Sequence, residues 1–169
     1  MTTQTDVKSA RLIVSGVFVS GRQRLKGILT LGTATAGVVD IFDDTVAPVA
    51  VTYGRAGTLV TVTHTSHGYA TGRVVGLAFV ANTGAAATNG NYTITVVDAN
   101  TYTVVDINSG TVTAGTAAVV GAYWLTSVDS PATATVTPTL VDIPGEGVLA
   151  VKGLVARLLN QTSAVIFYG

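Results

Sequence analysis

The sequence predicts an all-β protein in which a β-sandwich, split in two along the chain, carries an inserted small β-barrel. Valine and threonine supply 28 residues each, together a third of the 169 residues, and both are β-branched and favour strands. No segment carries a sustained apolar stripe at helical spacing, so we expect minimal helix. The residue pattern of the sequence changes near Gly54 and again near Trp124. We therefore expect 1–54 and 124–169 to form one discontinuous, jelly-roll-like sandwich and 55–123 to form the barrel.

The first sandwich segment follows a polar arm, Met1–Ala10, and contains short β-rich runs. Gly16 interrupts the first run and suggests a bulge or the close approach of another strand. Glycines at 54 and 57 suggest a junction with the insert at Gly54–Gly57. The expected strands are Arg11–Val19, Ile28–Gly32, Val38–Phe42 and Val46–Tyr53.

The segment Gly21–Gly27 (GRQRLKG) carries three cations at alternate positions around an expected hairpin turn. Alternation places Arg22, Arg24 and Lys26 on one face of an extended segment. Two interpretations stay open for these side chains. They contact an acidic partner surface, or they guard a solvated hairpin edge with charge.

The insert shows strand patterns separated by turn signals. Leu59–Thr63 alternates apolar and hydroxyl residues, which is typical of a half-buried strand. Asn89-Gly90 is a strong turn signal, and Asp98–Asn100 suggests a hairpin turn. The expected strands are Leu59–Thr63, Arg73–Val75 extended by Leu77–Val80, Tyr92–Val97, Thr101–Val105 and Val112–Val120, with turns at His64–Gly68 and Asn108–Gly110.

The last segment returns to the sandwich pattern. Thr133–Val141 alternates over its whole length, and Pro138 within it indicates an edge strand or a bulge. A tight loop follows at Asp142–Gly147. The last three expected strands are Val148–Val151, Leu154–Leu158 and Ala164–Tyr168.

Metal-binding patterns are incomplete. The chain has no cysteine and only two histidines, His64 and His67, and two histidines alone do not complete a zinc shell. Asp40, Asp43 and Asp44 lie close in sequence, but the spacing and terminal glutamate of a calcium loop are missing. We expect a polar turn there and no bound metal.

Catalytic patterns are also incomplete. A triad of Ser66, a histidine and Asp98 or Asp106 lacks any nucleophile-elbow pattern, and both aspartates are interpreted more simply as turn residues. Glu146 is the single glutamate, so paired carboxylates would have to come from aspartates. No phosphate-binding glycine motif is present. We expect a protein that is not an enzyme and has no cofactor.

Charge is sparse, since charged residues make up 11% of the chain and nine basic residues balance nine acidic ones. Such a chain has no cationic field for nucleic acid. The apolar run Leu12–Val19 is too short and too polar for a membrane helix or a signal peptide. We expect a soluble protein that packs against its own copies or a larger assembly, the alternative being a neutral, threonine-rich surface without a partner. The aromatic residues Tyr92, Tyr102, Tyr123 and Trp124 are dispersed, and most are expected in a core.

Two stretches of the insert carry a resemblance. LVTVTHTSHGYATGRVVGL, with its Ser66-His67-Gly68 turn and Thr71-Gly72, and NGNYTITVVDANTYTVV, with an Asn-Gly turn before a hairpin, are the matching residues. They resemble a small β-barrel module related to the first catalytic-cysteine half-domain of ubiquitin-activating enzymes, which recurs in bacteriophage virion proteins. The catalytic cysteine is not carried over. In phages the module is a structural or interaction domain.

The flanks resemble small phage β-sandwich proteins. The matching residues are Ile143–Leu149 (IPGEGVL), Gly153-Leu154 and Ser163–Gly169. These resemblances imply a virion protein, assembled in the host cytoplasm, of the capsid-decoration, knob or head-fibre type. Its partners would be the major capsid protein or other virion proteins, together with copies of itself, as in the trimers that are common among such appendages.

Two other functions stay open at this point. One is a tail-associated adaptor or receptor-binding module whose insert contacts host surface glycans. The other, much less favoured, is a hydrolase of surface polymer.

Overall fold

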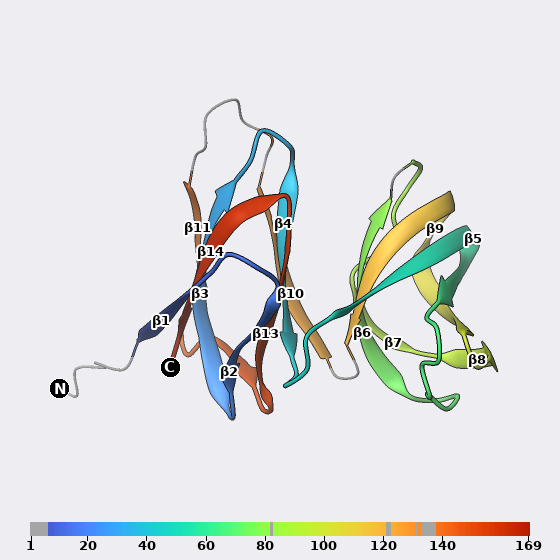
Figure 1. The fold of residues 1–169 in the computed structure, drawn as a ribbon, viewed down its shortest axis with the longest axis horizontal. Coiled ribbons are helices and arrows are strands. Elements are labelled where there is room, and N and C mark those ends of the chain that lie inside the picture. The colour runs from blue at the N-terminus through green and yellow to red at the C-terminus, as the bar shows by residue number, and fades with distance from the viewer. Residues whose placement is uncertain (1–6, 82, 121–122, 131, 133–137) are drawn as a thin grey trace. The chain divides into compact units, whose positions relative to one another are not determined.

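The computed structural model describes residues 7–81, 83–120, 123–130, 132 and 138–169. This part of the chain contains fourteen strands and no helix (Figure 1). The prediction of an all-β, sandwich-like fold is confirmed. The chain divides into two compact units, which we call the sandwich unit (1–47 and 125–169) and the inserted unit (48–124). The junction that the sequence suggested at Gly54–Gly57 lies inside a strand of the inserted unit.

The sandwich unit contains two antiparallel sheets, drawn as two layers in Figure 1. The first sheet has the strand order β1-β14-β3-β11, with β12 pairing the start of β3. The second sheet has the order β10-β4-β13-β2. The strands of the first sheet are β1 (Lys8–Leu12), β3 (Gln23–Gly32), β11 (Pro138–Asp142), β12 (Val148–Ala150) and β14 (Gln161–Tyr168). Those of the second are β2 (Gly16–Ser20), β4 (Gly37–Asp43), β10 (Tyr123–Ser130) and β13 (Gly153–Leu159).

Side chains from both sheets fill one core between them. Leu25, Ile28 and Ile166 come from the first sheet, and Ile41 and Leu154 from the second; all five are fully buried. In an antiparallel sheet successive side chains point to opposite faces. Each of these strands therefore presents its other residues on the outside of the sandwich.

The sandwich unit differs from the sequence prediction at Gly21–Gly27 and agrees with it at Pro138. The hairpin predicted at Gly21–Gly27 is wrong, because β2 and β3 belong to different sheets and the chain crosses between them at Gly21. The N–H of Gly21 donates to the carbonyl oxygen of Lys152, 2.7 Å away. This bond joins the β2–β3 crossing to the connection between β12 and β13. Pro138 begins the edge strand β11, as predicted. The rest of the expected strand Thr133–Val141, before Pro138, lies outside the described residues.

The inserted unit is one curled five-stranded sheet around its own core. Its long central strand β9 pairs with β5 along both of its halves, with β8 at its first half and with β6 at its second. Both halves of β5 and β9 send side chains into a single cluster that includes Tyr53, Val60, Leu77 and Tyr102. The strands are β5 (Val49–Thr63), β6 (Val74–Ala81), β7 (Gly90–Thr93), β8 (Thr95–Asp98) and β9 (Thr101–Val120).

One expected strand and one expected turn of the insert differ in the structure. The expected strand Tyr92–Val97 is broken at Ile94, which is fully buried, because β7 pairs with β6 while β8 pairs with β9. The turn predicted at Asn108–Gly110 is wrong, because those residues lie inside β9. There the single residue Thr58 of β5 faces the four residues 106–109 of β9, which form a bulge.

Candidate interaction surface

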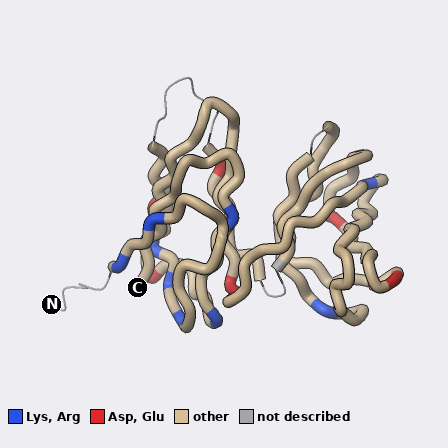
Figure 2. The backbone as a smooth tube through the Cα atoms, viewed as in Figure 1, with Lys and Arg blue, Asp and Glu red and all other residues tan. Residues whose placement is uncertain are grey.

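The three cations Arg22, Arg24 and Lys26 differ in their surroundings. Arg24 Nη2 lies 3.0 Å from Glu146 Oε2, and Lys26 Nζ donates to the backbone oxygen of Glu146 at 2.9 Å. Arg22 lies in the crossing between β2 and β3 and is exposed. Arg24 and Lys26 thus share one side of β3, and both bind Glu146 in the loop between β11 and β12. Figure 2 shows charged residues dispersed along both units, without a continuous stripe of one sign.

Asp40 is buried in β4 and not in a polar turn, so the prediction of a turn is wrong for this residue. Its carboxylate faces Arg157 across the β4–β13 pair. Arg157 Nη2 lies 2.6 Å from Asp40 Oδ2, and Arg157 Nε donates to the same oxygen at 2.7 Å. The hydroxyl of Ser127 donates to the other carboxylate oxygen. Both oxygens of Asp40 are therefore engaged in holding neighbouring strands together.

Asp43 organises the connection between β12 and β13. Its carboxylate accepts hydrogen bonds from the backbone N–H groups of Val151, Lys152 and Gly153, at 2.8, 2.7 and 3.2 Å. Asp44 accepts a bond from the N–H of Thr45 at 2.7 Å. These carboxylates serve backbone groups, and among the described residues no group of three or more His, Asp or Glu side chains is placed to hold a metal ion.

His67 fixes the turn after β5 with hydrogen bonds at both ring nitrogens. Its Nδ1 accepts the N–H of Tyr69 at 2.9 Å, so the ring proton of the neutral imidazole lies on Nε2. Nε2 is 3.0 Å from the carbonyl oxygen of Asp98, to which it donates. His64 lies beside it, with 6.0 Å between ring centroids. Burial first, and then the neighbouring His67, lower the pKa of His64 below its ordinary value.

The residues of the triad considered from the sequence, Ser66 with Asp98 or Asp106, have separate structural roles. Asp98 Oδ1 accepts the N–H of Asn100 at 2.7 Å, as expected for a turn residue. Asp106 is not a turn residue: it is fully buried in the β9 bulge and paired with Arg55. Ser66 has a φ of 52° in the turn after β5, and its N–H donates to Asn100 Oδ1 at 2.8 Å. No nucleophile, base and orienting carboxylate are brought together among these residues.

Two of the four singled-out aromatic residues belong to the core of the inserted unit. Tyr102 is fully buried, and Tyr92 packs against the same cluster with its hydroxyl donating to the carbonyl oxygen of Thr88. Tyr123 is exposed and Trp124 is half-buried. These rings do not form a shared platform for a sugar.

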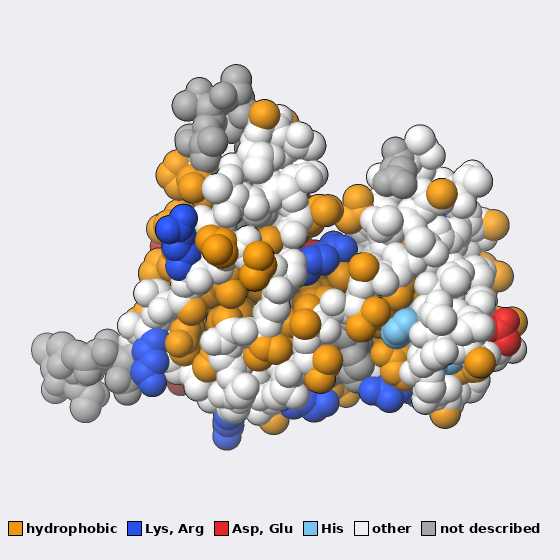
Figure 3. Space-filling view, in the orientation of Figure 1, with side chains coloured by type: hydrophobic (Ala, Val, Ile, Leu, Met, Phe, Trp, Pro, Cys, Tyr) orange, Lys and Arg blue, Asp and Glu red, His pale blue; other side chains and the backbone are white. Residues whose placement is uncertain are grey.

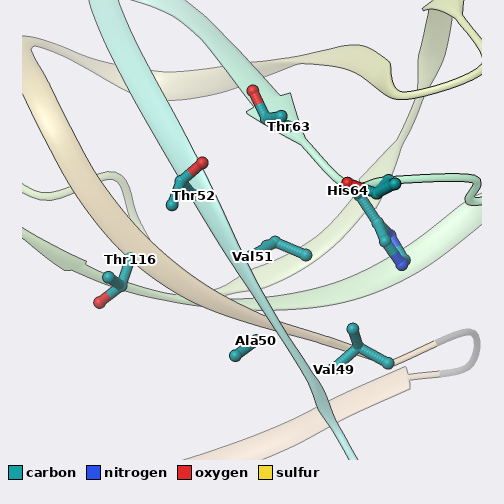
Figure 4. A pocket seen from close by; sticks show the side chains of 8 residues that line it. Val49, Ala50, Val51, Thr52, Thr63, His64 and Thr116 are labelled. Atoms are coloured by element: carbon teal, nitrogen blue, oxygen red, sulfur yellow. The ribbon is translucent and has the colours of Figure 1, made fainter.

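A groove of about 420 Å³ runs along the edge of β5 in the inserted unit (Figure 4). Four consecutive residues of the strand, Val49–Thr52, line one side, and Thr63–Thr65 line another. His64 is the only titratable side chain of this lining. The lining combines threonine hydroxyls with apolar side chains.

The outward face of the first sheet is apolar. It carries five large apolar side chains on three neighbouring strands, none of which belongs to the core cluster. Leu140 is 54% exposed, and the other four are half-buried. The residues are Leu29 and Leu31 on β3, Val165 and Phe167 on β14, and Leu140 on β11. We call this set the outer face.

A second apolar patch lies where β1 crosses into β2. Ile13 and Val14 in this connection are 67% and 69% exposed. Figure 3 shows hydrophobic side chains gathered on the sandwich unit in the region where Figure 1 draws this connection. The sandwich unit thus presents apolar surface on a sheet face and at a crossing between its sheets.

Sequence reasoning missed the outer face, although a signal existed. In a half-buried antiparallel strand one parity is apolar and the other polar. The runs Gly27–Leu31 (GILTL) and Ala164–Phe167 (AVIF) have apolar residues at both parities. Such runs indicate a sheet with two apolar faces.

No known protein family, curated protein or solved structure that was compared with this chain matches it. In the described part of the chain there is also no helix long and apolar enough to cross a membrane.

Proposed function

We propose that this protein is a non-enzymatic structural component of a tailed-phage virion, of the capsid-decoration or head-fibre type. It binds the shell or its own copies through the sandwich unit and carries the inserted unit as an added module. The observation that carries the proposal is the apolar outer face of the first sheet. A sheet with apolar residues on both faces is typically covered on both, and a contiguous exposed apolar patch marks an interaction site.

Three buried carboxylates, those of Asp40, Asp43 and Asp106, support a structural role. Asp40 and Asp106 are buried in ion pairs, and Asp43 holds three backbone N–H groups. General acid–base catalysis needs a titratable group free to exchange a proton with a substrate. These three carboxylates are committed to the fold.

The place of the insertion also supports the proposal. Residues 48–124 leave the sandwich after β4 and return at β10, and these two strands are neighbours in the second sheet. The inserted unit therefore takes the place of an ordinary connection between adjacent strands. A module added at such a point leaves the host core intact, which suits an anchor that carries an appendage. The choice of a phage virion as the assembly rests on the sequence resemblance of both parts to phage virion proteins.

The experiment is cryo-electron microscopy of particles of the phage that encodes this sequence, with an N-terminal affinity tag marked by gold. The tag precedes β1, so it does not interrupt either core. We expect label distributed over the shell. Label confined to the tail would replace decoration by the adaptor function, and glycan binding by the groove along β5 would be measured next. Particles without label would overturn the virion assignment.

A further inference from the structure

We propose that the outer face binds the same face of a second copy of this chain, in a two-fold dimer whose rim is closed by Arg11 of each copy and Asp142 of the other. The inference deepens the proposed structural role, on which its biological meaning rests, by naming the partner of this surface. It follows from the registers of the first sheet and from the position of its two unpaired charges.

Two rows of side chains cross this face. Residues directly opposite each other on antiparallel strands point to the same side. The first row is Arg11, Val165, Leu29 and Leu140, and the second row is Ser9, Phe167, Gly27 and Asp142. The middle of both rows is apolar or small, and the two charges lie at opposite edges, Arg11 on β1 and Asp142 on β11.

The surroundings of Gly27 confirm the side on which Asp142 lies. A Cβ on Gly27 would be 3.4 Å from Asp142 Oδ1 and 3.5 Å from Phe167 Cδ2. The carboxylate and the phenyl ring therefore flank the same point on the outer face. Leu12, the neighbour of Arg11, packs instead against the core between the sheets, so Arg11 points outward.

Arg11 and Asp142 do not neutralise each other within one chain. Three strand spacings separate β1 from β11, which is roughly 14 Å. Both residues are exposed, and neither has an ion pair with another described residue. The nearby charges Arg24 and Glu146 are already paired with each other. Lys26, which lies on the same side of β3 as Arg24, donates to the backbone oxygen of Glu146. Arg11 and Asp142 are thus the charged residues of the two rows themselves.

A two-fold axis parallel to the strands satisfies both charges at once. It places β1 of each copy over β11 of the other, so that Arg11 meets Asp142 twice and the apolar rows meet in between. The two charges are offset by one row, about 7 Å along the strand, which a long arginine side chain can span. A two-fold axis across the strands would place Arg11 over Arg11, and the repulsion disfavours it. Stacking two sheets in nearly aligned directions is a common packing.

The charge pattern favours a second copy over other occupants. A nucleic acid or a strongly acidic protein would require an excess of one sign on its binding surface. The two rows carry one charge of each sign at opposite edges, Arg11 and Asp142, and this arrangement is complementary to itself.

The size of the face predicts a weak dimer. Four strands and five residues cover roughly 20 by 17 Å, which is less than the roughly 800 Å² per partner of a standard stable interface. We therefore expect association that depends on protein concentration and that becomes important where copies are held side by side.

The experiment is sedimentation equilibrium of the full chain over a wide concentration range, with Arg11→Asp and Asp142→Arg measured separately and as an equimolar mixture. Each single variant creates two like-charge contacts in its own dimer, so we expect each to associate about ten-fold more weakly than the wild type. In the mixed dimer both contacts are again between opposite charges. The mixture should therefore regain wild-type association.

Asp129→Arg is the matched control, since Asp129 is an exposed aspartate on β10 of the other sheet. We expect it to associate like the wild type, and thermal denaturation checks that every variant is folded. If a charge variant does not fold, Leu140→Lys places a charge inside the contact at a residue that is already exposed and should abolish association. A wild type that stays monomeric, single variants that associate normally, or a mixture that does not recover would each overturn the dimer. A monomeric chain found on the phage shell would remove this inference alone, whereas a dimer absent from the virion would remove only the proposed role.

Discussion

Arg55 and Asp106 form an ion pair inside the inserted unit, with 3.0 Å between Arg55 Nη2 and Asp106 Oδ2 and with side chains only 1% and 0% exposed. The carboxylate also accepts the N–H groups of Thr88, at 2.8 Å, and Asn108, at 3.2 Å. The guanidinium donates to four backbone oxygens, those of Gly57, Ala85, Ala86 and Asn108. The pair therefore ties β5 and the β9 bulge to the loop before β7.

Replacing Asp106 by asparagine should lower the free energy of unfolding of the inserted unit by about 3–5 kcal/mol, because it leaves the buried guanidinium of Arg55 without a counter-charge. Urea denaturation measures the loss, and hydrogen exchange on β5 and β9 assigns it to this unit. Asp98→Asn is the control, since Asp98 is exposed at the end of β8 and asparagine can keep its bond to Asn100. A loss of less than about 1 kcal/mol would show that the pair is dispensable.

The same carboxylate predicts how the inserted unit responds to acid. Burial alone would raise the pKa of Asp106, but the hydrogen bonds from Thr88 and Asn108 and the charge of Arg55 outweigh it and hold the pKa below its ordinary value. A lowered pKa gives stability that is present above the unfolded value, about 3.9, and that is lost as the pH falls through the folded value. The stability difference between the wild type and Asp106→Asn should thus be constant above about pH 4 and shrink below it. A difference that stays constant down to pH 2 would contradict this assignment.

His64 predicts a second, milder dependence at higher pH. Because burial and the neighbouring His67 lower its pKa, the unfolded chain takes up a proton near pH 6.5 before the folded chain does. The stability of the inserted unit should therefore be greatest above about pH 6.5 and decline as the pH falls from there toward the folded pKa. Urea midpoints at several pH values measure the decline. His64→Gln should remove this step and keep the one at lower pH due to Asp106; a variant that keeps both would assign the step elsewhere.

Gly115 on β9 faces the ring of Tyr53 on β5. A Cβ on Gly115 would be 2.2 Å from Cε1 of Tyr53, which is 3% exposed and also packs against Phe79. Gly115→Ala should therefore destabilise the inserted unit by about 1–3 kcal/mol, as overpacking does in cores. Thermal denaturation measures the change. Gly90→Ala is the control, because the nearest atom to its added Cβ is 3.8 Å away; equal melting of both variants would be the contrary result.

Local patterns in the sequence located many of the strands but not their partners, and the expected strand Arg11–Val19 is wrong, because it is divided into β1 and β2 of different sheets. Alternation located Leu59–Thr63, and turn signals located the β8–β9 hairpin, because both depend on neighbouring residues. The assumed hairpin at Gly21–Gly27 failed because whether two strands share a sheet is decided by distant strands, here β13 for β2 and β14 for β3. The turn predicted at Asn108–Gly110 does not reverse the chain. It lies at a bulge within β9, because β5 pairs with β9 on both sides of it.

The partners of the buried charges and the outward position of the outer face could not be predicted from the sequence, for a related reason. Asp40 meets Arg157 at a separation of 117 positions, and no local pattern connects them. The prediction of Asp106 as a turn residue is wrong, because the local turn signals could not include Arg55, which lies on another strand and pairs with the buried carboxylate. Apolar residues at both parities were visible, but their outward position depends on which face the second sheet covers.

The interpretation of the cations stays a prediction. Replacing Arg22, Arg24 and Lys26 together by glutamine should lower the occupancy of this chain on phage particles without unfolding it, because the exposed pair Arg24–Glu146 contributes at most about 1 kcal/mol. Occupancy on purified particles and the denaturation midpoint are the two measurements. Glu146→Gln removes the ion pair but keeps the cations, so it should bind at least as well as the wild type, and binding through the cations should weaken as salt is added. Unchanged occupancy of the triple variant at low salt would leave these residues as a solvated edge and place the contact on the apolar surfaces.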